Sequence, residues 1–217
     1  MYKCYLLGKN IKNSRSGEIY RELSEKDNID FLYENADVNP EEIPKFVRFI
    51  KETGARGFNV TAPYKSEIIK YLDDMSEAVN ALNAANTVIN KNGKFVGYNT
   101  DVYGAQRAYE NFLRDGKTLI LGRGGAARAL IYAFKDFDLT LYVRDSSQND
   151  MLLKIKPDLN FIYDLKNCDF TNVINATSVG FNEERAIITK KFDSQKTAVD
   201  IIYTPERTLF LSEMEKQ

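Results

Sequence analysis

Short apolar segments alternate with helix-like stretches along the first half of the chain. The strand-like segments are 2–7 and 57–60, and the helix-like stretches are 41–51 and 66–71. Two further apolar segments, 86–90 and 94–98, flank Asn92-Gly93, a dipeptide that suits a tight hairpin turn because both residues tolerate positive φ. The pattern predicts an α/β region that ends in an antiparallel hairpin.

A second series begins after Arg114-Asp115-Gly116. Residues 118–121 are typical of a buried strand, a glycine-rich turn follows, and 126–134 have helical character. Later strands are expected at 139–143, 161–163, 172–176 and 198–202, and a helix at 206–216. This order predicts a βαβ unit and a parallel sheet.

The boundary between the two series is expected near Gly104. Residues 102–113 have the pattern of a connecting helix, which Asn99 or Thr100 would cap. The sequence therefore predicts two α/β domains, residues 1–104 and residues 105–217. The sequence contains no internal repeat, and no flexible linker separates the two domains.

Composition indicates a globular protein with a small partner. Of the 217 residues 43% are hydrophobic, and the formal net charge of −1 gives no basic field for nucleic acid or an anionic membrane. No apolar run approaches the roughly twenty residues of a membrane span, and the first residues do not resemble a signal peptide. We expect a cytoplasmic protein that acts on a small molecule.

The absence of histidine limits the catalytic mechanisms and metal sites that are possible. It excludes Ser-His-Asp and Cys-His hydrolysis and removes the commonest zinc ligand. Cys4 and Cys168 lie far apart in the sequence without metal-ligand spacing, so we expect free buried thiols in a reducing compartment and no metal. Proton transfer would have to use Lys, Asp, Glu, Tyr or Cys.

The glycine-rich turn is a candidate phosphate site. Gly122, Gly124 and Gly125 stand between a strand and a helix, where glycine permits a tight turn and the first helical N–H groups, from Ala126 onward, can face a pyrophosphate. Arg123 could add a cation there. An ordinary αβ turn would look similar, but the order strand, turn, helix, strand favours dinucleotide binding.

Two charged residues with opposite implications end the next strand. Arg144 and Asp145 lie roughly 20 residues beyond Gly122, where a Rossmann fold reads the adenosine ribose. Arginine would hold a 2′-phosphate and favour NADP, whereas aspartate would accept from a free 2′-hydroxyl and favour NAD. A charged turn after a strand is the simpler alternative.

Seven motifs in order resemble the shikimate dehydrogenase family across essentially the whole chain. They are Ser14-Arg15-Ser16, Asn59-Val60-Thr61-Ala62-Pro63-Tyr64-Lys65, Ala84-Ala85-Asn86-Thr87, Gly97-Tyr98-Asn99-Thr100-Asp101, the glycine turn Gly122 to Arg128, Asn175-Ala176-Thr177-Ser178-Val179-Gly180 and Asp200-Ile201-Ile202-Tyr203-Thr204-Pro205. The resemblance implies an N-terminal shikimate-binding domain, a Rossmann-like NADP domain and a reaction in the cleft between them.

The resemblance also implies roles for individual residues. Lys65 would be the acid-base group and Asp101 its partner; Asp101 would also bind substrate, with Ser14, Ser16, Thr61, Asn86 and Tyr203. Cofactor contacts would come from the glycine turn, Arg144, Asp145, Thr177 and Ser178. Taken alone, a lysine at this position is more often a solvated residue in the first turn of a helix. A neighbouring carboxylate would raise the lysine pKa, whereas burial would lower it.

Three departures from the family pattern affect these expectations. Gly17 replaces the usual proline after Ser-x-Ser, so that loop would be less rigid. Val143-Arg144-Asp145 replaces Asn-Arg-Thr, which leaves NAD as an alternative to NADP. The family continues into a return segment that supplies a substrate-binding glutamine; Gln217 does not match that motif, so we expect the segment to be lacking.

The leading hypothesis is an NADP-dependent shikimate dehydrogenase, an oxidoreductase of aromatic amino acid biosynthesis that reversibly reduces 3-dehydroshikimate. The alternatives are a quinate/shikimate dehydrogenase that uses NAD and a non-catalytic homologue that binds shikimate or a nucleotide. Either a monomer or a homodimer is compatible with the sequence.

Overall fold

Two compact units make up the chain. The computed structural model describes residues 1–147, 149–166, 169–181, 185–188 and 196–215, so Cys168 and Gln217 lie outside the described residues. The units are Met1–Thr100 and Asp101–Gln217, and each is built around its own sheet. The predicted mixed α/β fold is confirmed. No helix in the described ranges is long and apolar enough to cross a membrane.

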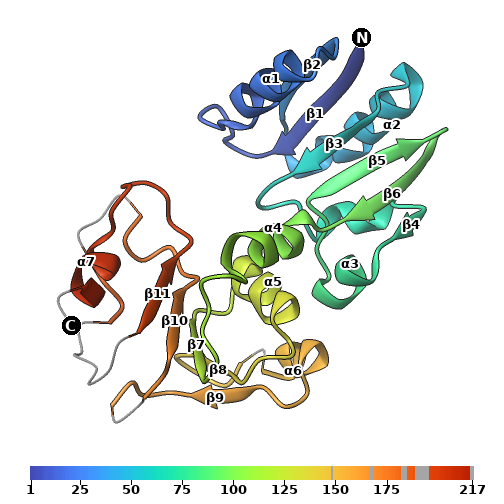
Figure 1. Ribbon diagram of the computed structural model, residues 1–217. Coiled ribbons are helices and arrows are strands. Elements are labelled where there is room, and N and C mark those ends of the chain that lie inside the picture. Colours follow the sequence, from blue (N-terminus) through green and yellow to red (C-terminus); the bar gives the residue numbers. More distant parts are fainter. Residues whose placement is uncertain (148, 167–168, 182–184, 189–195, 216–217) are drawn as a thin grey trace. The chain divides into compact units, whose positions relative to one another are not determined.

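The first unit has a six-stranded mixed sheet in the order β2-β1-β3-β5-β6-β4 (Figure 1). Its strands are β1 (Tyr2–Gly8), β2 (Phe31–Asp37), β3 (Gly57–Val60), β4 (Asp74–Met75), β5 (Thr87–Lys91) and β6 (Lys94–Tyr98). β1 pairs in parallel with β2 and β3, whereas β5 is antiparallel to both β3 and β6. Asn92 and Gly93 have φ angles of 55° and 85°, which confirms the predicted hairpin turn.

Helices cover both faces of this sheet. They are α1 (Ser16–Lys26), η1 (Pro40–Glu42), α2 (Ile43–Thr53), η2 (Glu67–Tyr71) and α3 (Glu77–Leu82). α2 buries Phe46 and Ile50 against Phe58 of β3. On the opposite face, the Tyr20 ring of α1 stacks on Tyr33 of β2 with 4.6 Å between ring centroids.

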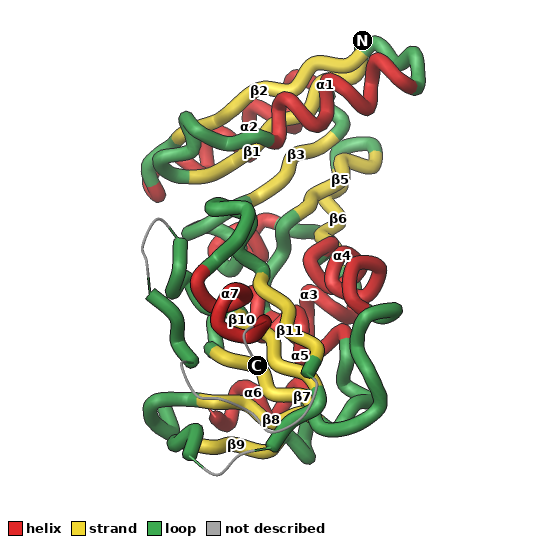
Figure 2. The backbone as a smooth tube through the Cα atoms, turned by 60° about the vertical axis from the view of Figure 1, so that its left-hand side comes forward, coloured by secondary structure: helices red, strands yellow, loops and turns green. Residues whose placement is uncertain are grey.

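The second unit has a five-stranded parallel sheet in the order β11-β10-β7-β8-β9. Its strands are β7 (Thr118–Leu121), β8 (Leu139–Tyr142), β9 (Asn160–Ile162), β10 (Asn172–Asn175) and β11 (Thr197–Asp200), and its helices are α4 (Thr100–Tyr109), α5 (Gly125–Ala133), α6 (Asn149–Ile155) and α7 (Leu209–Glu215). Leu119 and Leu121 of β7 pack with Phe210 and Met214 of α7, which lies beside β11 (Figure 2).

Three predicted elements end earlier or differ in type. Residues 66–71 form a short 3₁₀ turn rather than an α-helix. The helix expected to reach Leu113 ends at Tyr109, because the buried side chain of Asn172 bonds the backbone N–H and C=O of Arg114 at 2.9 and 2.8 Å and directs the chain into β7. β11 ends at Asp200, whose carboxylate accepts from the N–H of Ile202 at 3.0 Å.

Candidate active site

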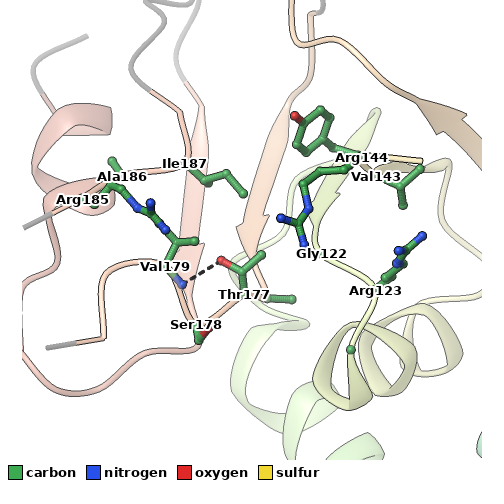
Figure 3. A pocket seen from close by; sticks show the side chains of 13 residues that line it. Gly122, Arg123, Val143, Arg144, Thr177, Ser178, Val179, Arg185, Ala186 and Ile187 are labelled. Atoms are coloured by element: carbon green, nitrogen blue, oxygen red, sulfur yellow. Dashed lines mark hydrogen bonds between the residues drawn. The ribbon is translucent and has the colours of Figure 1, made fainter. Parts of the chain in front are cut away.

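A pocket of about 690 Å³ opens at the carboxyl ends of the second unit's strands (Figure 3). The strand order reverses between β7 and β10, with β8 and β9 on one side and β11 on the other. Open parallel sheets bind ligands at such a switch point because the loops diverge there. The walls of the pocket are the turn after β7, the end of β8, the loop after β10 and residues 185–187.

The turn after β7 requires glycine at position 122. Its φ is +102°, and a Cβ there would lie 2.7 Å from Cγ2 of Thr177 and 3.1 Å from the carbonyl oxygen of Ala176. Gly124 caps the start of α5 without a side chain, and a Cβ on it would meet no atom within 4 Å. The helix N-terminus is therefore open to a ligand, and its N–H groups and dipole suit a pyrophosphate.

Arg123 and Asp145 form a two-pronged ion pair across the edge of the pocket. Nη1 and Nη2 of Arg123 donate to Oδ1 and Oδ2 of Asp145 at 2.8 and 3.0 Å. Nη1 also donates to the backbone oxygens of Asp145 and Ser147, at 3.2 and 2.6 Å. The bonds from Arg123 and from Ser147 hold the pKa of the Asp145 carboxyl well below its usual range.

The loop after β10 is held by the buried side chain of Asn175. Its Oδ1 accepts from N and Oγ1 of Thr177 at 3.1 and 2.7 Å. Its Nδ2 donates to the carbonyl oxygen of Val179 at 3.2 Å and to Oδ1 of Asp200 at 3.1 Å. Thr177 Oγ1 in turn accepts from the N–H of Val179 at 3.1 Å, shown dashed in Figure 3. These hydrogen bonds fix the backbone conformation of the loop that forms this wall of the pocket.

The structure gathers six of the expected cofactor residues around one pocket. These are Gly122, Arg123, Gly124, Arg144, Thr177 and Ser178. Gly125 and Ala126 form the first turn of α5, and Asp145 is engaged by Arg123. Asn175 was quoted in a motif without a role; its full burial and four hydrogen bonds identify it as the residue that shapes the loop.

The expected substrate residues of the first unit occupy loops at strand ends. Ser14 and Ser16 lie at the start of α1, and the Ser14 hydroxyl donates to the Ser16 hydroxyl at 3.1 Å. Thr61 and Lys65 follow β3, where the N–H of Thr61 donates to the carbonyl oxygen of Leu7 at 2.9 Å. The carbonyl oxygen of Lys65 accepts from the N–H of Ala85 at 2.8 Å.

Asn86 joins two of the motifs. Its Oδ1 accepts from the backbone N–H of Thr100 at 2.8 Å and from the hydroxyls of Thr100 and Thr87 at 3.1 and 3.0 Å. Because Oδ1 takes these donors, the orientation of the Asn86 amide is set. Its NH₂ group is thereby directed away from these donors.

Asn59 and Tyr33 form a pair to which the sequence analysis assigned no role. The Tyr33 hydroxyl donates to Oδ1 of Asn59 at 2.9 Å, and Nδ2 of Asn59 donates to Oγ1 of Thr87 at 3.1 Å. These residues line a second cavity of about 650 Å³ beside α1. Asn59 lay in a quoted motif, but nothing in the strand pattern indicated its partner on β2.

Asp101 and Tyr203 belong to the second unit. Asp101 is in the first turn of α4, where a carboxylate suits the helix dipole. Tyr203 follows β11 and is 73% exposed. Cys4 is a half-buried free thiol, and burial raises its pKa, so it has the character of an inert structural cysteine.

Comparison with known proteins identifies the family. The "Shikimate dehydrogenase substrate binding domain" family matches residues 6–88. A shikimate dehydrogenase (NADP(+)) of Clostridium botulinum (strain Loch Maree / Type A3) is 31% identical over 100% of this chain and 88% of its own length. The chain belongs to the shikimate dehydrogenase family. The resemblance seen in the seven motifs is thus confirmed.

Solved structures of the shikimate dehydrogenase family share both units of the fold. The shikimate 5-dehydrogenase of Thermus thermophilus, in complex with NADP(H) and shikimate, matches with a TM-score of 0.89 and 27% identity, covering 100% of this chain and 84% of that one. The Listeria monocytogenes enzyme, in complex with shikimate and NAD, has the same TM-score, identity and coverage. The family therefore includes solved complexes with either cofactor.

Proposed function

We propose that this chain is a shikimate dehydrogenase that reversibly reduces 3-dehydroshikimate to shikimate with NADP as cofactor. The observation that carries the proposal is the pocket at the β7–β10 switch point, where Gly122 and Gly124 leave the start of α5 open to a pyrophosphate. The ordered motifs and the full-length relatives named shikimate dehydrogenase (NADP(+)) support it.

The first unit would bind the substrate. Shikimate carries a carboxylate and three hydroxyls, so its site needs several fixed hydroxyl and amide partners. Ser14, Ser16, Thr61 and Asn86 supply such groups, and the hydrogen bonds to Asn86 Oδ1 fix the orientation of its amide.

The second unit would bind the cofactor. The open N-terminus of α5 suits the pyrophosphate, and Arg144 suits a 2′-phosphate. Thr177 and Ser178 would line the nicotinamide half through their backbone, since the Thr177 hydroxyl is engaged by Asn175 and Val179. Tyr203 and Asp101 are assigned their substrate contacts by motif match alone.

Lys65 would exchange the proton with the substrate oxygen. Oxidation of a secondary alcohol needs a group that takes the hydroxyl proton, and the reverse reaction needs the same group to return it. When bound, NADP⁺ would accept the hydride in the oxidation, and NADPH would supply it in the reduction. Lysine fits the role in a protein without histidine, and Asp101 would hold the substrate hydroxyls.

Substitution of Lys65 tests the proposal. Nicotinamide absorbance would follow turnover with shikimate and NADP in the wild type, Lys65→Met and the control Lys70→Met, which removes a nearby exposed lysine whose pair with Glu67 contributes little. We expect Lys65→Met to lower kcat by at least ~100-fold, as for loss of a general acid-base group, with shikimate affinity by calorimetry changed less than threefold.

Three outcomes separate the explanations. Near-normal kcat in Lys65→Met would refute the assignment of that lysine while leaving the activity in place. A folded wild type that binds shikimate without turnover would refute the dehydrogenase and favour the binding-protein alternative. Turnover with NAD in preference to NADP would refute the cofactor assignment.

A further inference from the structure

Arg144 and Asp145 are neighbours in the loop that follows β8, and they favour different cofactors. An aspartate there accepts hydrogen bonds from a free ribose 2′-hydroxyl, and it repels a 2′-phosphate. An arginine there binds the 2′-phosphate. The sequence therefore contains a contradiction that the environment of the two side chains has to resolve.

The Asp145 carboxylate already accepts four hydrogen bonds. Its Oδ1 accepts from Arg123 Nη1 at 2.8 Å, from the N–H of Ser147 at 2.9 Å and from the Ser147 hydroxyl. Its Oδ2 accepts from Arg123 Nη2 at 3.0 Å. A carboxylate offers about four acceptor positions, two on each oxygen, and three of the four donors bind Oδ1. A ribose hydroxyl could therefore bond Asp145 without displacing a donor only at the second position of Oδ2, beside Arg123 Nη2.

Arg123 also cancels the charge of Asp145. The guanidinium makes parallel bonds to both carboxylate oxygens, the strongest geometry for such a pair, and its side chain is only 24% exposed. It reaches from the glycine turn after β7 to the loop after β8, so it also fixes that loop through the backbone oxygen of Ser147.

Arg144 has a different environment. Among the described residues no side chain or backbone group forms an ion pair or hydrogen bond with its guanidinium, and it lines the pocket. In Figure 3 its side chain extends into the pocket toward Thr177, whereas Arg123 lies beside Val143. The net charge of the three side chains is +1. Since Arg123 and Asp145 neutralise each other, that charge is carried by Arg144, which lines the pocket.

We propose that Arg123 is a specificity-positioning residue: by neutralising Asp145 and bonding both of its carboxylate oxygens, it lets Arg144 select nucleotides that carry a 2′-phosphate. The inference rests on the proposed function, since it concerns the adenosine end of the same cofactor. On this inference, the loop after β8 selects NADP. Asp145 then has a structural role, as the partner of Arg123, and does not bind the ribose.

Binding of adenosine fragments tests this without turnover. Calorimetry would measure Kd for 2′,5′-ADP and 5′-AMP, which differ only in the 2′-phosphate. The proteins are the wild type, Arg123→Met, the double variant Arg123→Met/Asp145→Asn, Arg144→Met, and the control Arg107→Met, which removes one exposed arginine of α4. Thermal unfolding would check that each variant is folded.

We expect the wild type to bind 2′,5′-ADP at least tenfold more tightly than 5′-AMP. Arg123→Met should reduce this preference roughly tenfold, because an unpaired carboxylate then faces a phosphate dianion. Adding Asp145→Asn should restore the preference to within threefold of wild type, Arg144→Met should abolish it, and Arg107→Met should leave it unchanged. A merely structural Arg123 would weaken both ligands alike.

The outcomes distinguish this inference from the proposed function. An Arg123→Met preference within threefold of wild type overturns the inference alone. A wild type that binds both fragments equally also overturns the inference. If that protein oxidises shikimate with NAD, the proposed dehydrogenase activity still holds. Binding of neither fragment, by protein that still oxidises shikimate, places the nucleotide elsewhere and overturns the inference but not the activity.

Discussion

Asn175→Ala is the substitution whose cost follows most directly from the structure. The side chain is fully buried and makes four hydrogen bonds, to N and Oγ1 of Thr177, to the carbonyl oxygen of Val179 and to Asp200. Each bond contributes about 1 kcal/mol net, so independent losses would total about 4 kcal/mol. Asp200 keeps its other donors, Ile202 N and Thr208 Oγ1, so we expect a loss of about 3 kcal/mol.

Urea unfolding followed by far-UV circular dichroism would measure this loss. The matched control is Asn111→Ala, which truncates an exposed asparagine and should change the free energy of unfolding by less than about 0.5 kcal/mol. A loss of about 3 kcal/mol corresponds to a decrease in Tm of about 6–12 °C for a chain of this size. The affinity for NADPH should also fall, because the loop that Asn175 holds lines the pocket.

A difference below about 1 kcal/mol between the two variants would refute the reasoning. It would mean that water or loop rearrangement replaces the four bonds, so that Asn175 does not determine the shape of the loop. An unchanged free energy of unfolding with a large loss of NADPH affinity would instead indicate that Asn175 contacts the cofactor directly.

Two further predictions concern the same pocket. Gly122→Ala should weaken NADPH binding at least tenfold by fluorescence titration, because its Cβ meets Thr177 and its φ of +102° strains any other residue; unchanged affinity would show that the turn adapts freely. The pKa of Asp145 is lowered, so its pair with Arg123 is present above the ordinary aspartate pKa and is lost only as pH falls through the lower folded value. Carboxyl NMR of wild type against Arg123→Met should therefore show Asp145 titrating at higher pH in the variant, and coincident curves would contradict the pairing.

Much of the fold follows from local sequence. The hairpin at Asn92-Gly93 and the turn at Gly122 depend on residues that accept positive φ, a property of the residues themselves. Buried strands such as β7 are continuous apolar runs and are visible without a structure. β2 was not predicted, because its partly exposed residues show no clear alternation of polar and apolar positions.

The sequence by itself determined the α/β class, the glycine-rich turn and the ordered motifs, because each depends on residues close together along the chain. The tertiary structure alone decided which charges pair. Arg123 and Asp145 belong to different loops, and only the parallel pairing of β7 with β8 brings those loops together. The hydrogen bonds from the Asn172 side chain to the backbone of Arg114, which end α4 early, likewise depend on the position of β10 in the sheet. Such contacts between distant segments are set by strand order, which local propensity does not encode.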